Sequence, residues 1–69
     1  MPNIIKGRFD EVPLGREFKL GNGGLFVKES KTTATNTRTG FSEYFTPFRI
    51  VTYNKASNKY NATDTRLKG

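Results

Sequence analysis

The reversal Gly21-Asn22-Gly23-Gly24 constrains the fold most, because it separates two short runs of residues that have the period of a strand. Before it, Phe18 and Leu20 alternate with charged residues, and after it Leu25 and Val27 alternate with their neighbours in the same way. Glycine and asparagine tolerate the positive φ angles that a tight turn requires. This segment therefore predicts a β-hairpin and an all-β fold.

Short apolar runs on either side of the hairpin extend the β pattern, and no stretch of the chain has helical periodicity. Pro47 interrupts the aromatic stretch 41–53, so we expect the chain to leave the sheet at Thr46-Pro47. The expected architecture is four to five short antiparallel strands, curled into a small barrel or sheet of the SH3-like or OB-like type. The inward-facing positions predict a core of Ile5, Phe9, Phe18, Leu20, Leu25, Val27, Phe48 and Ile50.

With 69 residues the chain has room for one domain, which we place at residues 1–60. Residues 61–69 offer little apolar area and are expected to form a flexible basic tail. Residues 31–40 contain five threonines and only Ala34 as an apolar side chain, which predicts an exposed strand or a mobile loop over 31–39. If this segment is ordered, we expect it to pair with another subunit. Residues 59–61 are a candidate for a last short strand.

The absence of histidine and cysteine removes the usual zinc ligands, disulfides and the usual general base near neutral pH. Lys28 and Ser30 lie two residues apart and are expected to mark an ordinary strand face, not a catalytic pair. The carboxylates show no clustered spacing suited to acid–base catalysis. The glycine-rich reversal lacks the Lys-Ser/Thr and the helix of a phosphate-binding loop. The sequence predicts no enzyme, no metal site and no cofactor.

Twelve Lys and Arg against six Asp and Glu give a net charge of +6. Such charge on a small domain attracts nucleic acid, anionic membranes or acidic proteins, although it is also compatible with a merely solvated basic surface. No run approaches the ~18 apolar residues of a membrane span, and the first residues lack the apolar core of a signal peptide. We therefore expect a soluble protein of the cytoplasm.

Basic residues interleave with aromatic ones, as in proteins that bind single strands through phosphate contacts and base stacking. If Leu25 and Val27 face the core, Phe26 faces solvent, and by the same count Tyr53 shares a face with Arg49. The sequence therefore predicts binding of nucleic acid, single-stranded or without sequence specificity. The predicted binding residues are Phe26, Lys28, Arg38, Arg49, Tyr53, Lys55 and Lys59.

Docking onto a protein is the alternative, since surplus aromatic residues also supply the anchors of an interface. Tyr44, Phe45 and Tyr53 are the candidate anchors. The chain would then be an accessory protein that modulates a host or phage protein, steered by its basic surface toward an acidic partner. A homo-oligomer, for example a homodimer that buries Phe45 and Tyr53, would explain the same rings without a foreign partner.

The pattern Val12-Pro13-x-Gly15-x-x-Phe18, followed by Leu25-Phe26-Val27-Lys28-x-Ser30, then Ala34 and Thr39-Gly40, resembles short uncharacterised β-hairpin proteins of tailed bacteriophages and bacteria. The resemblance covers about residues 9–51. It implies an origin in a phage or mobile element, and a host-cell cytoplasm as the place of action. It carries over no catalytic residue.

Overall fold

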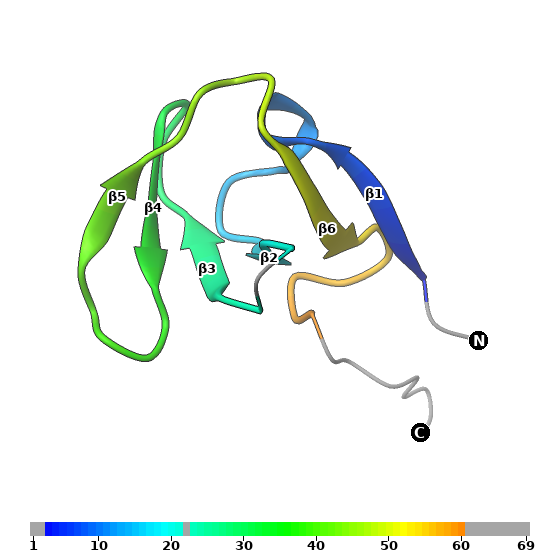
Figure 1. Cartoon of the computed structure of the whole chain (residues 1–69). Helices are drawn as coiled ribbons and strands as arrows, with labels where there is room; N and C mark the ends of the chain where they lie inside the picture. Colours follow the sequence, from blue (N-terminus) through cyan, green and yellow to red (C-terminus); the bar gives the residue numbers. More distant parts are fainter. Residues whose placement is uncertain (1–2, 22, 61–69) are drawn as a thin grey trace.

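The computed structural model describes residues 3–21 and 23–60 and shows an all-β protein built on one six-stranded antiparallel sheet (Figure 1). The strand order across the sheet is β1-β6-β2-β3-β4-β5. The elements are β1 (Ile4–Arg8), the 3-10 turn η1 (Phe9–Glu11), β2 (Glu17–Lys19), β3 (Leu25–Lys28), β4 (Thr33–Asn36), β5 (Ser42–Tyr44) and β6 (Ile50–Asn54).

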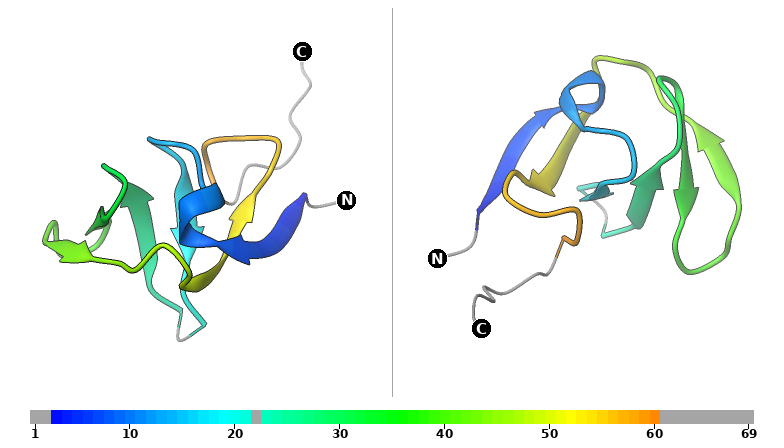
Figure 2. Two further views of the ribbon diagram at one scale, coloured as in Figure 1. Left: turned by 90° about the horizontal axis from the view of Figure 1, so that it is seen from above. Right: turned by 180° about the vertical axis from the view of Figure 1, so that it is seen from behind.

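The sheet is bent into a trough, with β1 and β6 in one wing, β3, β4 and β5 in the other, and β2 at the bend (Figures 1 and 2). Over the described residues no pairing joins the outer strands β1 and β5, so the sheet is not closed. The all-β prediction is confirmed. Of the two expected forms, a barrel or a curled sheet, the structure shows an open curled sheet, and it has six strands in place of the expected four to five.

The predicted hairpin is confirmed as β2 and β3, which pair antiparallel. The Leu20 backbone N–H donates to Gly24 O at 3.0 Å, and the Gly23 N–H donates to Leu20 O at 3.0 Å. Gly23 has a φ of 99°, a left-handed conformation that a residue with a Cβ rarely adopts. The turn glycines therefore direct the chain back onto its own strand, as the sequence predicts.

Aromatic rings fill the inner side of the trough. The rings of Phe9 and Phe45 stack with centroids 5.1 Å apart, and Phe18 meets both of them edge-on at 5.4 Å. Such pairs each add about 0.5–1.5 kcal/mol to the burial of their area. The buried apolar residues are Phe9, Val12, Phe18, Phe26, Ala34, Phe45, Val51 and Tyr53, with Ile5 and Leu20 packed against them.

Two segments outside the strands close the upper side of the trough: η1 and the connection 45–49, which spans the two wings in Figure 1. The backbone N–H of Phe9 donates to Arg49 O at 2.8 Å, and that of Asp10 donates to Pro47 O at 3.0 Å. The chain leaves the sheet at Thr46-Pro47, as predicted, and these bonds hold the departing segment over the core.

Four of the eight residues that were predicted to form the core are not part of it. Phe48 and Ile50 are 69% and 53% exposed, and Leu25 and Val27 are only half-buried. Strands β3 and β6 carry apolar side chains on both faces, so their alternation alone cannot say which face is inward. Pairing decides it, because Phe26 lies directly opposite the buried Phe18 and therefore shares its face.

The threonine-rich segment is a strand of this chain. Strand β4 pairs with β3 on one side and β5 on the other, and Ala34 is fully buried. At its start the Ser30 hydroxyl accepts the backbone N–H groups of Thr32 and Thr33, and at its end Asn36 Oδ1 accepts those of the next turn. The expectations of a loop, and of pairing with another subunit, were therefore wrong, because backbone pairing and polar turns stabilise the segment without apolar alternation.

The last described residues, 55–60, fold back beside β2. The Glu17 backbone N–H donates to Asn58 O at 2.8 Å, and Glu17 Oε1 accepts the Tyr60 N–H at 2.8 Å. Residue 59 lies in a bend and residue 60 in a turn, so neither forms the candidate strand. The predicted flexible tail 61–69 lies outside the described residues.

Candidate nucleic-acid interface

The seven residues predicted to bind nucleic acid do not form one surface. Three of them are buried on the inner side of the trough: Phe26, Lys28 and Tyr53. The other four are exposed and separate: Arg38, Arg49, Lys55 and Lys59.

Phe26 and Tyr53 are core residues, and their expected exposure was wrong. Phe26 is 2% exposed and its ring stacks on that of Phe18 at 5.8 Å. Tyr53 is 7% exposed and lies opposite Ile5 on one side and Phe18 on the other. Neither ring can stack on a base in this fold. Phe45, the partner of Tyr53 in the expected homodimer interface, is buried as well.

Lys28 is a lysine inside the core. Its Nζ donates to the backbone oxygen of Phe9 at 2.9 Å and lies 4.5 Å from the centroid of the Phe9 ring. Burial lowers the pKa of Lys28 below its usual value, while the nearby Asp10 carboxylate acts in the opposite direction. The side chain therefore links β3 to η1, and its ammonium group is not available to a phosphate.

Replacing Lys28 with methionine is expected to change how stability depends on pH. Because the pKa of Lys28 is lowered in the folded chain, the unfolded chain binds more protons between the two pKa values. The free energy of unfolding of the wild type should therefore rise, relative to Lys28→Met, as the pH approaches the ordinary lysine pKa of 10.5. Urea denaturation of both proteins across the alkaline range measures this, and parallel profiles would contradict it.

The four exposed predicted residues lie at three places. Arg38 is in the turn between β4 and β5, and Arg49 precedes β6 with its guanidinium 5.8 Å from the Phe45 ring centroid. Lys55 and Lys59 follow β6, and Lys59 Nζ lies 4.0 Å from a carboxylate oxygen of Glu17. They contribute positive charge to separate parts of the surface.

A different set of basic residues is brought together on the outer face of β1, β6 and β2. Lys6 lies directly opposite Thr52, and Thr52 lies directly opposite Lys19. Residues opposite one another in a sheet point to the same side, so these three form one row across three strands, which we call the basic row. Two strand spacings place the Cα atoms of its two lysines about 10 Å apart. Among the described residues neither lysine forms an ion pair.

An aromatic ring lies over one end of the basic row. The Tyr60 hydroxyl is 3.1 Å from Thr52 Oγ1, in hydrogen-bonding contact, and Lys19 Nζ is 5.2 Å from the centroid of the Tyr60 ring. The backbone N–H of Tyr60 also donates to Glu17 Oε1, and this bond helps to fix the position of the same residue. The row thus combines two ammonium groups, a hydroxyl and a positioned ring.

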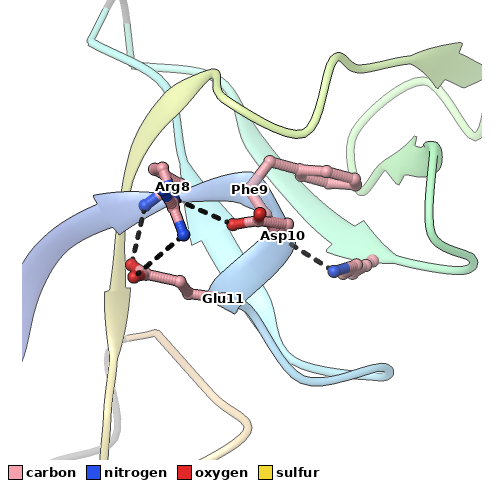
Figure 3. A network of polar contacts seen from close by, with 5 residues as sticks. Arg8, Phe9, Asp10 and Glu11 are labelled. Atoms are coloured by element: carbon pink, nitrogen blue, oxygen red, sulfur yellow. Dashed lines mark hydrogen bonds and ion pairs between the residues drawn. The ribbon is translucent and has the colours of Figure 1, made fainter.

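Further along the same face, Arg8 lies opposite Ile50, and its guanidinium is 5.7 Å from the centroid of the exposed Phe48 ring. This arginine is already held by carboxylates. Its Nε is 3.2 Å from Asp10 Oδ1 and an Nη is 3.8 Å from Glu11 Oε2 (Figure 3). Arg8 therefore adds little free positive charge, and the basic row ends at Lys6.

The sequence contained the signals for this site, but interpreting them required knowing which face of each strand points inward. Lys19 follows the buried Phe18, and Lys6 follows Ile5, which packs against the core. A correct inward assignment of these two positions puts both lysines outside. Strands β1 and β2 both pair with β6, and no local sequence pattern predicts this long-range pairing.

Comparison of the chain with protein-family models, curated proteins and solved structures gives no significant match. Within residues 3–21 and 23–60, no three side chains of the His, Cys, Asp and Glu types gather as a metal site would require. The part of the chain that the structure describes also contains no helix of the length and apolar character needed to cross a membrane.

Proposed function

We propose that this chain is a small basic protein that binds single-stranded nucleic acid, without sequence specificity, on the outer face of β1, β6 and β2. The observation that carries the proposal is the basic row, in which Lys6 and Lys19 flank Thr52 with no carboxylate partner in the described chain. Ammonium groups in this arrangement suit the phosphates of one strand.

Tyr60 supplies the second element that binding of a single strand uses. A base has two faces available for stacking only when it is not enclosed in a duplex, and stacking on an aromatic ring is tolerant of base identity. Contacts from lysines to phosphates carry no sequence information either. The combination therefore favours single strands without favouring a particular sequence.

Related features of the proposal follow from the sequence. We take the protein to be a binding protein and not an enzyme, of a phage or mobile-element type, acting in the cytoplasm. We also take the trough-shaped sheet to be an open relative of the small SH3-like or OB-like barrels, which present a sheet face to oligonucleotides in the OB case.

The test is fluorescence anisotropy with labelled single-stranded and duplex oligonucleotides of equal length. We expect binding of the single strand, and the logarithm of its association constant should fall linearly with the logarithm of the salt concentration, with a slope of about −0.7 per phosphate contact. Two lysine contacts give a slope of about −1.4, and further cations steepen it. Equal affinity for duplex, or no binding at low salt, contradicts the proposal.

The accessory-protein alternative retains one exposed anchor. Tyr44 is 70% exposed, whereas its two companions in that hypothesis, Phe45 and Tyr53, are buried. Capture of partners from a bacterial lysate treated with nuclease distinguishes the two functions. A stoichiometric protein that remains after the nuclease supports the alternative, and loss of all captured material supports nucleic acid.

A further inference from the structure

Strand β5 has a free edge. Phe41 O accepts a backbone bond of 2.8 Å and Phe45 N donates one of 2.7 Å, both across to the β4 side. Backbone groups alternate in direction along an antiparallel strand, so those of Ser42 and Tyr44 point away from β4. Among the described residues nothing pairs with the donors and acceptors that these two residues present at the edge of the sheet, next to the exposed rings of Phe41 and Tyr44.

Strand β1 forms the opposite edge. The backbone groups of Asn3 and Phe9 bond toward β6, at 3.0 and 2.8 Å, so those of Ile4, Lys6 and Arg8 point away from the sheet. The Arg8 N–H is occupied, because it donates to a Glu11 carboxylate oxygen at 3.0 Å. Within residues 3–21 and 23–60, the outward backbone groups of Ile4 and Lys6 have no partner, as is the case for the two outward residues of β5.

The two edges carry opposite charge. On β5 the one charged residue is Glu43, and the Ser42 hydroxyl of the same strand donates to Glu29 Oε1 at 3.1 Å. On β1 the free positive charge is that of Lys6, because Asp10 and Glu11 already pair with Arg8. A fully paired β5–β5 contact sets the two Glu43 residues opposite one another, and a fully paired β1–β1 contact sets the two Lys6 residues opposite one another. Like charges directly opposite are destabilising, so each edge complements the other edge and not itself.

We propose that β5 of one copy of this chain pairs with β1 of a second copy. The contact is head-to-tail, so it leads to a ring or an open array. It satisfies the outward backbone groups of both edges and covers Tyr44. A domain of this size, with a small core and no disulfide, gains stability from such association. The proposal is independent of nucleic-acid binding.

Proline at an outward-facing position blocks one edge and leaves the internal ladder intact, because the N–H that it removes points away from the sheet. Ser42→Pro blocks β5, and Lys6→Pro blocks β1. Ser42→Ala and Lys6→Ala are the matched controls, which lose the same side chain but keep the N–H. Circular dichroism checks the fold, and where a proline variant has lost it, Tyr44→Lys replaces Ser42→Pro and Lys6→Glu replaces Lys6→Pro.

Sedimentation velocity up to millimolar concentration provides the readout. We expect the wild type and both alanine controls to grow in mass with concentration, and each blocked variant to remain at the monomer mass of 7.8 kDa. A mixture of the two blocked variants keeps one β5 edge and one β1 edge, so it should form a species of twice that mass. A monomeric wild type, self-association of either blocked variant, or no association in the mixture overturns the proposal.

Discussion

Replacing Phe9 with alanine is expected to lower the free energy of unfolding by about 3–5 kcal/mol. Phe9 is fully buried and contacts the rings of Phe18 and Phe45, and its backbone anchors η1 to the segment before β6. A domain of this size has a total stability of about 3–10 kcal/mol. The loss is therefore a large fraction of the total stability, which urea denaturation followed by circular dichroism measures.

Phe48→Ala is the matched control, because it removes the same side chain from the surface. Phe48 is 69% exposed, and in the part of the chain that the structure describes its ring contacts the Arg8 guanidinium alone among charged and aromatic groups. An exposed cation–π pair contributes about 0.5–1 kcal/mol, so we expect a loss no larger than this. Equal losses in the two variants would show that the core is not centred on Phe9.

Reversing both lysines of the basic row, Lys6→Glu with Lys19→Glu, is expected to weaken binding of a single strand about 50- to 100-fold at 50 mM salt. Two lost phosphate contacts remove about 1.4 from the salt slope, and the logarithm of salt concentration changes by about 1.3 between 1 M and 50 mM. The repulsion from the new carboxylates adds to this loss. Fluorescence anisotropy across a salt series measures both the affinity and the slope.

The control for this pair is Lys31→Glu with Arg38→Glu. Each lysine or arginine changed to glutamate lowers the net charge by two, so either double variant falls from +6 to +2. Lys31 and Arg38 are exposed in the wing of β4 and β5, away from the basic row. We expect the control to keep most of the affinity. Equal losses would mean that net charge, and not the basic row, determines binding.

The local features of the fold were predictable from the sequence. The β2–β3 hairpin follows from its turn glycines, and the break at Pro47 follows from the missing N–H of proline. The inward faces of β3 and β6 were not predictable, because Phe26 and Ile50 stand next to apolar residues that fit the core equally well. Only long-range pairing distinguishes the two registers.

The candidate site shows the same limit. The sequence shows the lysines of the site as positive charges. Their convergence depends on β6 lying between β1 and β2, and the spacing of residues 6, 19 and 52 along the chain does not predict that arrangement. Lys28 was misplaced for a related reason. A lysine in a strand is ordinarily exposed, and its burial here depends on a carbonyl and a ring that η1 brings to it.

Two-dimensional amide NMR, with the full chain titrated by a short single-stranded oligothymidine, tests the location and existence of the binding face together. Shift changes are expected at the backbone amides of Lys6, Lys19, Thr52 and Tyr60, saturating with the affinity found by anisotropy. Shift changes confined to the turn that carries Arg38, or none at any amide, would contradict the account.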